Sequence, residues 1–271
     1  MFKYDLSFII LNYRNKNLVK YCIKGIEGLS LDFKYEIIVV DNKSNDGCEE
    51  MIKKNFLQVK FIAAKNNRGY ATGNNLGIKN SQGKYIVIIN PDVAVFPATI
   101  EKLFKYLEAN PEVGIVGPKL LNPDQTLQYS CGIFPDWRLP IYRRSLLGKT
   151  NRGKKWLKKY LMISWDHNEI KEVDWLFGAF LFIRKSCLDK VGLFDERFFL
   201  YLEDTDLCRR FWRNGYKVVY NPEVSVIHYH QRNSAENKGL GGLFKKTGRI
   251  HLYSFLKYYL KYLGQKNPHQ K

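Results

Sequence analysis

Short runs of apolar residues, rich in Ile and Val, recur through the first half of this chain. Each run is bounded by polar or glycine-containing segments, which is typical of strands buried on both faces of a sheet. We therefore predict strands at residues 6–12, 36–41, 59–63, 85–90 and 113–116.

Between these runs, apolar residues are spaced for helices. Residues 17–29 place Leu18, Cys22 and Ile26 on one helical face, and residues 99–109 have similar spacing. Strands that alternate with helices predict right-handed crossovers and a doubly wound, mostly parallel α/β sheet. Ligands bind such sheets at the carboxyl ends of the strands, so the polar residues found there are the candidates for a site.

Polar side chains follow three of the predicted strands: Asn12, the pair Asp41 and Asn42, and the pair Asn90 and Asp92. A nucleotide site needs acceptors for a base or ribose at one strand end, and a second acid can hold a divalent cation against a diphosphate. The same acids are equally compatible with simple turns. The chain lacks the motifs of P-loop NTPases and of dinucleotide dehydrogenases, which argues against both classes.

Residues 66–78 combine three glycines with four asparagines. Glycine allows close approach of the backbone to a ligand, and a helix that starts in such a loop can contact a phosphate or sugar. In the second half of the chain, residues 173–183 are apolar around Gly178, which predicts a strand with a bulge or a close ligand approach.

A helix is predicted from Glu203 to the glycine at position 215. Asp204 falls on its apolar stripe, so this acid points inward at the start of a helix, either as an N-terminal cap or as a general base. Asp206 pairs by spacing with Arg209 and Arg210, and we place these three on the solvent face. Glu203 and Asp204 diverge by about 100°, which favours a single base over a two-carboxylate hydrolase.

Two histidines, His228 and His230, follow the next predicted strand and share one side of an extended chain. One of them can complete an oxygen and nitrogen metal site or hold a phosphate, and a purely structural histidine is the alternative.

Composition adds a strong positive charge to this picture. The 271 residues are 45% hydrophobic and carry a formal net charge of +18. Residues 143–160 and 238–271 each hold eight Lys or Arg and no acid, so the remaining chain is nearly neutral. This excess of positive charge favours an anionic partner such as nucleic acid, a membrane surface or a phosphate-bearing substrate. The alternative is that both segments are solvated, Lys-rich parts of the surface.

Targeting and redox signals are weak. Residues 175–183 are too short an apolar run to span a membrane, and the N-terminal run predicts a core strand rather than a signal peptide. Five scattered cysteines without a C-x-x-C motif argue against a disulfide framework or structural zinc and fit a cytoplasmic protein.

The order of these motifs resembles the inverting family 2 glycosyltransferases, and within them the rhamnosyltransferase-type enzymes of bacterial surface polysaccharide synthesis. The matching segments run in the family order through residues 5–235: FIILNYRN, VVDNKSNDG, NNRGYATGNNLGI, INPD, WLFGAFLFIRK, GLFDERFFLYLEDTDLCRR and GYKVVYNPEVSVIHYHQRNS. The resemblance implies a GT-A fold, a Rossmann-like and mostly parallel sheet flanked by helices. Residues 1–235 would form the catalytic domain, with a nucleotide-sugar half (1–118) and an acceptor half (119–235), and residues 236–271 a basic helical tail.

The resemblance also implies roles for individual residues. Asp204 matches the catalytic base, and Asp41 would contact the nucleobase. Asp92 and His228 would bind Mg²⁺ or Mn²⁺; because the family's first metal-motif acid is replaced by Asn90, only Asp92 supplies a carboxylate. The remaining donor-binding positions are Asn12, Asn42, Arg68, Gly69 and Asn75. The acceptor-binding positions are Trp175, Gly178 and Glu203.

The implied activity is inverting transfer of a sugar from a nucleoside-diphosphate donor to a hydroxyl of a glycan or lipid-linked glycan. dTDP-rhamnose is the expected donor, with UDP-hexoses as the alternative. A sugar-phosphate nucleotidyltransferase, an inactive scaffold of the same fold and a nucleic-acid-binding protein are the rivals. The last lacks zinc spacing, an RNP-like strand and a helix-turn-helix signal.

Residues 245–263 predict one amphipathic, basic and aromatic-rich helix in the tail. Its apolar face comprises Leu252, Phe255, Leu256, Tyr259 and Leu263. Such a helix suits peripheral attachment to the anionic inner face of the cell membrane. The alternative is a helix that packs on the catalytic domain or on a sister subunit in a homodimer.

Overall fold

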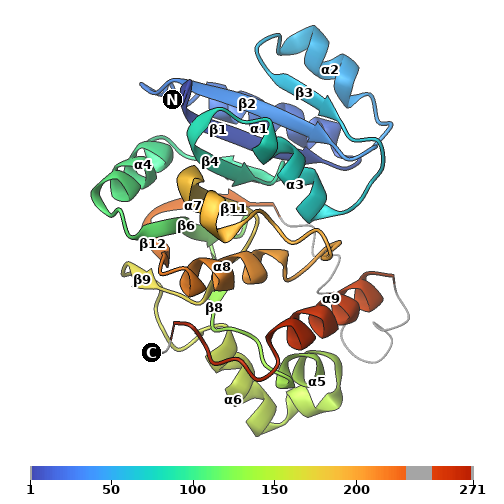
Figure 1. The fold of residues 1–271 in the computed structure, drawn as a ribbon, viewed down its shortest axis with the longest axis vertical. Coiled ribbons are helices and arrows are strands. Elements are labelled where there is room, and N and C mark those ends of the chain that lie inside the picture. The colour runs from blue at the N-terminus through green and yellow to red at the C-terminus, as the bar shows by residue number, and fades with distance from the viewer. Residues whose placement is uncertain (1, 230–245, 270–271) are drawn as a thin grey trace.

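The computed structural model describes residues 2–229 and 246–269, and it has the predicted mixed α/β fold (Figure 1). A central, mostly parallel sheet carries a hydrophobic core cluster on each face. The main path of this sheet runs through β3 (Lys60–Ala63), β2 (Tyr35–Asp41), β1 (Tyr4–Asn12), β4 (Gly83–Ile89), β11 (Phe180–Arg184), β6 (Val113–Leu121), β12 (Lys217–His228) and β5 (Val93–Val95).

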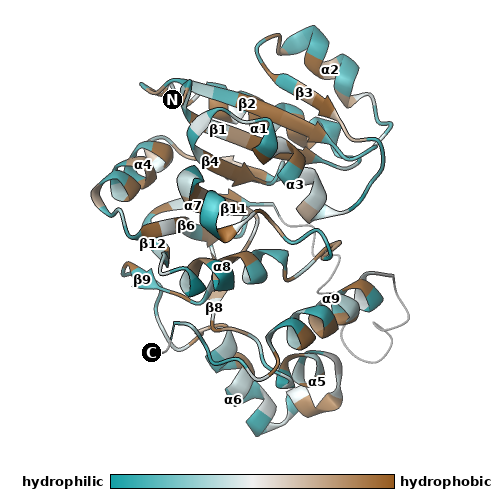
Figure 2. Cartoon of the chain, viewed as in Figure 1, coloured by the Kyte–Doolittle hydropathy of each residue, from teal (hydrophilic) through white to brown (hydrophobic). Residues whose placement is uncertain are grey.

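The pairing explains why the predicted strand ends meet. β1 pairs in parallel with β2 and β4, β2 pairs in parallel with β3, and β6 pairs in parallel with β12. β11 runs antiparallel between β4 and β6, and β5 runs antiparallel to β12. The sheet strands are apolar along most of their length, as expected for strands covered on both sides (Figure 2).

Short strands extend this sheet toward the second half of the chain. β7 (Leu127–Gln128) pairs with β6, and β9 (Lys171–Glu172) pairs with β12. β8 (Cys131–Gly132) and β10 (Trp175–Leu176) form a separate antiparallel pair. Gly178 lies in a turn between β10 and β11. The prediction of one strand through this glycine is therefore wrong, because two strands in different sheets meet at the turn.

Helices pack on both faces through their apolar stripes. One core cluster includes residues of α1 (Lys16–Glu27), α2 (Cys48–Asn55) and α4 (Thr99–Ala109). The other includes residues of α3 (Tyr70–Lys79), α7 (Lys185–Val191) and α8 (Glu203–Arg213). At the end of the molecule away from α2 lie α5 (Arg138–Arg144), the 3₁₀-helix η1 (Leu146–Lys149), α6 (Asn151–Tyr160) and α9 (Lys246–Tyr262) (Figure 1).

The tail helix α9 packs on the rest of the protein. Phe255, Tyr258 and Tyr262 are buried in the same core cluster as Trp156 of α6 and Phe211 of α8. The buried face also contains a histidine and a serine, so it is rotated from the face predicted from the apolar pattern. Leu252, Leu256 and Leu263 of that predicted face are exposed. Among the described residues, no helix is both long and apolar enough to cross a membrane.

Candidate active site

The carboxyl ends of β1 and β2 bring Asn12 and Asp41 side by side. The two residues are register partners in the sheet, and Asn12 Nδ2 donates to Asp41 Oδ1 at 2.7 Å. The second oxygen of Asp41 accepts the backbone N–H of Ser44 at 2.9 Å. Both side chains are buried, so the hydrogen bonds fix the turn in which Asp41 stands at the predicted donor end of the sheet.

Three side chains at this turn carry atoms that can bind a metal: Asp41, Asp46 and Cys48. Their potential ligand atoms all lie within 4.8 Å of one another. The Asp46 oxygens already accept the backbone N–H groups of Lys16 at 3.0 Å and of Cys48 at 3.1 Å. Burial, followed by the charge of Asp46, raises the pKa of the Cys48 thiol to about 12. A thiol is a soft ligand, so this set suits Mg²⁺ or Mn²⁺ less well than a set of oxygen and imidazole donors.

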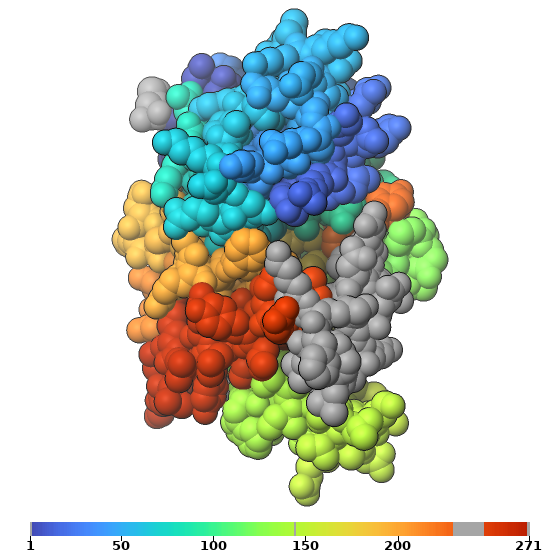
Figure 3. Space-filling view, turned by 90° about the vertical axis from the view of Figure 1, so that its right-hand side faces the viewer, coloured from blue at the N-terminus to red at the C-terminus, as the bar shows by residue number. Residues whose placement is uncertain are grey.

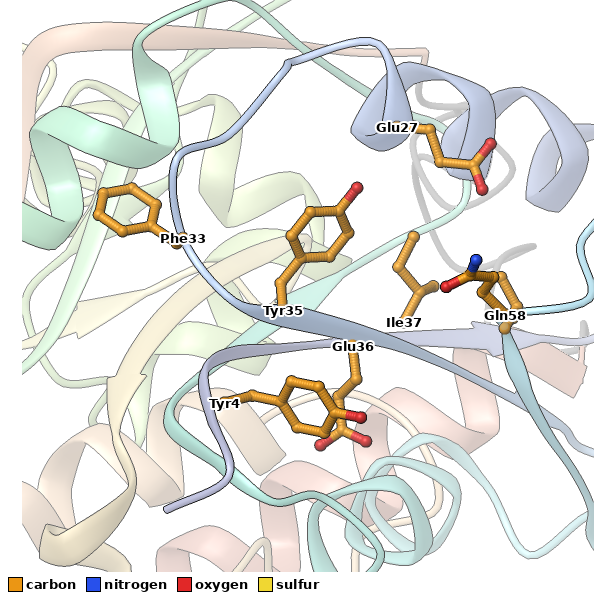
Figure 4. Close-up of a pocket in the computed structure, with 8 residues that line it drawn as sticks. Tyr4, Glu27, Phe33, Tyr35, Glu36, Ile37 and Gln58 are labelled. Atoms are coloured by element: carbon orange, nitrogen blue, oxygen red, sulfur yellow. The ribbon is translucent and has the colours of Figure 1, made fainter.

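Two cavities lie near β2, at opposite ends of the strand. One, of about 400 Å³, is lined by Asp41, Asp46 and Phe61 and thus adjoins the predicted nucleobase position. The other, of about 470 Å³, is lined by Tyr4, Tyr35 and their neighbours where β1 and β2 begin (Figure 4). Because ligands of parallel α/β sheets bind at the carboxyl ends, the first cavity belongs to the candidate site.

The glycine-rich segment forms the predicted loop and helix start. Asn42 Nδ2 donates to the carbonyl of Gly69 at 3.1 Å, which joins this loop to the end of β2. Gly69 has φ +94°, and a Cβ at this position would lie 2.1 Å from the carbonyl oxygen of Phe199. Only glycine therefore allows the loop to pack against residue 199, where the N–H of Tyr70 donates to that same carbonyl at 2.7 Å.

Two predicted donor residues of this segment have other partners. The amide of Asn75 donates to the carbonyl of Phe194 at 2.8 Å and accepts the Phe194 N–H at 3.0 Å. Arg68 is exposed and lies 3.8 Å from Glu196. Both residues thus face the 194–196 segment, and their contact with a donor stays a prediction.

Asp92 and His228 come together from distant parts of the sequence. His228 pairs with Val93 in the β5–β12 ladder, and its Nε2 lies 3.3 Å from Asp92 Oδ1. Its other nitrogen, Nδ1, is 2.8 Å from the side-chain oxygen of Gln128, which orients the ring. A carboxylate oxygen and an imidazole nitrogen at this spacing suit a hard divalent cation such as Mn²⁺. His230 lies outside the described residues.

The backbone of Asn90 links the predicted metal motif to β11. Its N–H donates to the carbonyl of Ala179 at 2.9 Å, which ties the predicted metal motif to the start of β11. Gly178 precedes Ala179 in the turn that leads into β11. The ring of Phe177 lies 5.7 Å from that of His228, centroid to centroid.

Asp204 is buried at the start of α8, and its carboxylate is held by three hydrogen bonds. Oδ2 accepts the N–H of Gly178 at 2.9 Å. Oδ1 accepts the N–H and the hydroxyl of Thr205 at 2.6 and 3.2 Å. Burial raises the pKa of Asp204 above its ordinary value, and these hydrogen bonds oppose the shift. The prediction that Asp204 points inward is therefore confirmed.

The neighbouring carboxyl, Glu203, is also buried. Burial and then the charge of Asp204 raise its pKa well above the ordinary value. Its Oε2 has no hydrogen-bond partner within the described part of the chain. Trp175, the remaining acceptor-side residue, is buried and donates its indole N–H to the carbonyl of Ile133 at 2.7 Å.

Tyr70 joins the donor loop to the base, and the sequence pattern did not single it out. Its hydroxyl donates to the carbonyl of Gly178 at 2.6 Å. Burial, followed by the charges of Glu203 and Asp204, raises its pKa well above the usual value, so the hydroxyl remains a donor. Its position at the first residue of the helix after Gly69 is the only signal that the sequence offered.

The predicted solvent position of Asp206 is wrong. Its side chain is fully buried, and it accepts hydrogen bonds from Arg210 Nε at 2.8 Å, Lys261 Nζ at 2.5 Å and the Tyr262 hydroxyl at 2.8 Å. Arg209 is also buried and donates to the Tyr258 hydroxyl. The face is dry because α9 covers it.

Solved structures with a similar architecture identify the fold. A mannosyltransferase from Pyrobaculum calidifontis, in complex with GDP-Man and Mn²⁺, matches with a TM-score of 0.62 at 18% identity over 99% of this chain and 67% of its own. S. aureus TarS 1–349 in complex with UDP-GlcNAc matches with a TM-score of 0.55 at 15% identity over 82% of this chain and 58% of its own. At these identities the likeness shows the fold, which is the GT-A fold of glycosyltransferases.

The sequence places the chain more narrowly. Residues 7–168 match the model of Glycosyl transferase family 2, and residues 150–259 match that of Glycosyl transferase family group 2. The chain belongs to glycosyltransferase family 2, and it is of the rhamnosyltransferase type. Membership of this family supports glycosyl transfer rather than the two alternatives raised from the sequence, nucleotidyl transfer and nucleic-acid binding.

Two similar proteins are rhamnosyltransferases by name. The rhamnosyltransferase WbbL of Escherichia coli K12 is 27% identical over 92% of this chain and 90% of its own length. The N-acetylglucosaminyl-diphospho-decaprenol L-rhamnosyltransferase of Mycobacterium tuberculosis is 27% identical over 77% of this chain and 71% of its own. These relatives support the predicted role in polysaccharide synthesis.

Proposed function

We propose that this glycosyltransferase inverts the anomeric centre as it transfers a sugar from a nucleoside diphosphate to a hydroxyl of a glycan or lipid-linked glycan. The observation that carries the proposal is the buried Asp204 carboxylate at the start of α8, which is held by hydrogen bonds from Gly178 and Thr205. One oriented base suits a single displacement. Adjacent helix positions such as 203 and 204 diverge by about 100°, so this pair does not flank one bond as the two carboxyl groups of a hydrolase do.

In the proposed reaction, Asp204 accepts the proton of the acceptor hydroxyl. The hydroxyl oxygen forms a bond to the anomeric carbon from the face opposite the diphosphate, and the bond from that carbon to the diphosphate oxygen breaks. The raised pKa of Asp204 makes it a stronger base than an exposed aspartate. Three hydrogen bonds keep its carboxylate oriented toward the acceptor during this step.

We propose that Asp92 and His228 hold Mg²⁺ or Mn²⁺, whose charge would offset that of the departing diphosphate. The oxygen and imidazole donors of Asp92 and His228 suit such a hard ion better than a set that includes the soft Cys48 thiol. The mannosyltransferase of the same fold was solved with GDP-Man and Mn²⁺, which supports a metal and a nucleotide sugar in this chain as well.

The names of the two relatives favour a rhamnose donor, so we propose dTDP-rhamnose. A thermal-shift panel of dTDP-rhamnose, UDP-glucose, UDP-GlcNAc and GDP-mannose, each with Mn²⁺, tests the donor. dTDP-rhamnose should raise the melting temperature most, and Asp41→Ala should remove that difference. A larger shift with a UDP-hexose would favour the alternative donor.

We further propose that the protein acts at an anionic membrane surface, where a lipid-linked acceptor would lie. Leu252, Leu256 and Leu260 expose an apolar stripe on α9, although the other face of the helix is packed. The basic segment at 143–160 lies at the same end of the molecule (Figures 1 and 3). Apolar side chains next to clustered Lys and Arg are typical of interfacial binding.

Flotation with phosphatidylglycerol vesicles tests this surface. Binding should be strong at low salt and weaker at high salt, and Leu256→Asp combined with Leu260→Asp should abolish it. Leu57→Asp is the matched control, because Leu57 is the most exposed large apolar residue described and belongs to a different part of the fold. Equal flotation of all three proteins, or none by the wild type, would contradict membrane attachment.

A further inference from the structure

Helix α8, which carries Asp204, is held in place by hydrogen bonds from α9 to Asp206. Lys261 Nζ and the Tyr262 hydroxyl both donate to Oδ1 of Asp206, at 2.5 and 2.8 Å. Arg210, one turn along α8, holds the other oxygen. Asp206 is fully buried, so these donors supply the polar contacts that water cannot.

Asp206 and Asp204 share the first turn of α8. Neighbouring positions of an α-helix are separated by a fixed rise and rotation, so anchoring Asp206 also sets where Asp204 stands. The turn needs such an anchor because it follows two non-glycine residues with positive φ, Tyr201 at 73° and Leu202 at 67°. The N-cap residue, Leu202, makes no side-chain hydrogen bond to the start of this helix.

α9 also holds the segment that leads into this turn. Ser254 Oγ donates to the carbonyl of Leu200 at 2.8 Å, and the ammonium of Lys257 donates to the carbonyl of Arg197. Lys261 bridges to Asp195 at 2.7 Å as well as to Asp206. One face of α9 therefore contacts the 195–202 segment and α8 together.

The same segment supports the donor loop. Residue 199 accepts the N–H of Tyr70 through its backbone carbonyl. The Tyr70 hydroxyl in turn donates to Gly178, whose N–H binds Asp204. The contacts form a closed path from α9 through the 195–202 segment, Tyr70 and Gly178 to the base, and back to α9 through Asp206.

We propose that Lys261 and Tyr262 are positioning residues for the transfer reaction, which act through Asp206 to hold Asp204 in register with the donor loop. This inference rests on the proposed role of Asp204 as the base. It assigns the tail helix a part in catalysis that is separate from any attachment to a membrane. The two residues touch neither substrate in this proposal, so their loss should reduce turnover more than binding.

The test compares Lys261→Met, Lys261→Arg and Tyr262→Phe with Lys266→Met, an exposed tail lysine whose side chain makes no contact with Asp206. Lys261→Met should lower kcat by about 10–100-fold, the cost of a misplaced reacting group, with KM and nucleoside-diphosphate binding within twofold. Tyr262→Phe should lower kcat less, and Lys261→Arg should recover most of the loss. Lys266→Met should match the wild type.

Hydrogen exchange measured by mass spectrometry supplies a readout that does not depend on activity. Lys261→Met should speed exchange in residues 199–206 and leave β1 and β4 unchanged. Unchanged exchange there, or wild-type kcat in folded Lys261→Met, would overturn the inference. If Lys261→Met does not fold, Tyr262→Phe decides by the same criteria. A wild-type protein that transfers no sugar would contradict the proposed function instead, and the exchange result would still test the anchoring.

Discussion

The backbone N–H of Gly178 donates to Oδ2 of Asp204 at 2.9 Å, although the two residues are 26 positions apart. The contact joins the turn between β10 and β11 to the first turn of α8. A Cβ at position 178 would lie 3.2 Å from the Tyr70 hydroxyl, so a side chain here would crowd that hydroxyl rather than the Asp204 carboxylate. The predicted close approach of a ligand at this glycine stays a prediction.

The pH dependence of turnover should report the environment of Asp204. Burial raises its pKa above the ordinary 3.8, so the base loses its proton only at a pH above that value. We expect the acid limb of kcat/KM to lie above pH 4. Thr205→Val removes a hydroxyl that stabilises the ionised form, so it should move the limb to higher pH. A limb that stays in place in Thr205→Val would contradict this account of the base.

Two glycine substitutions should have opposite effects on stability. Gly69→Ala places a Cβ 2.1 Å from a backbone oxygen at a positive φ, and we expect it to destabilise the fold by more than about 2 kcal/mol. Gly25→Ala, in the exposed middle of α1 with open space around it, should stabilise by about 0.5–1 kcal/mol. Urea denaturation measures both. Equal stability of the two variants would mean that the loop does not pack as described.

Metal dependence should follow Asp92 and His228 rather than the cluster around Cys48. Asp92→Ala and His228→Ala should each lower turnover by at least about tenfold, and excess chelator should do the same to the wild type, because the diphosphate charge would no longer be offset. Cys48→Ser should retain Mn²⁺-stimulated activity. Full activity of the wild type in excess chelator would remove the metal from the mechanism.

The contact between His269 and Asp174 should make stability depend on pH. His269 Nδ1 lies 2.6 Å from Asp174 Oδ1, and this hydrogen bond raises the pKa of His269 above its ordinary 6.5. The stabilisation is then fully present below pH 6.5 and is lost as pH rises through the raised pKa. His269→Ala should therefore lower the melting temperature by about 2–4 °C more at pH 6 than at pH 9. An equal loss at both pH values would contradict a charged contact.

The alternation of strands and helices, the inward acid at the start of α8 and the loop before α3 could be predicted from local pattern. Each depends on periodicity or on a residue's own conformational preference, which neighbours in sequence reveal. The pairing of Asp92 with His228 could be expected only through resemblance, since β5 and β12 meet by sheet topology.

The buried Asp206 could not be predicted, because its partners Lys261 and Tyr262 come from a helix about 55 positions away. Spacing within α8 indicated Arg209 and Arg210 as partners, and a charged face without visible partners is normally solvated. The apolar pattern of α9 was misleading for a related reason. Its buried face includes His251 and Ser254, and Ser254 finds its partner only in the folded chain.

The most direct test of the account is the turnover of Asp204→Asn, which keeps the shape of the side chain but removes the base. Turnover of this variant is measured with the same donor and acceptor as turnover of the wild type. Asp189→Asn, at an exposed position of α7, is measured in parallel as the control. We predict that Asp204→Asn lowers kcat by about 10²–10⁴-fold while the affinity for the nucleoside diphosphate is kept, and that Asp189→Asn behaves as the wild type. Sugar transfer by Asp204→Asn at near the wild-type rate would contradict the assignment of the base.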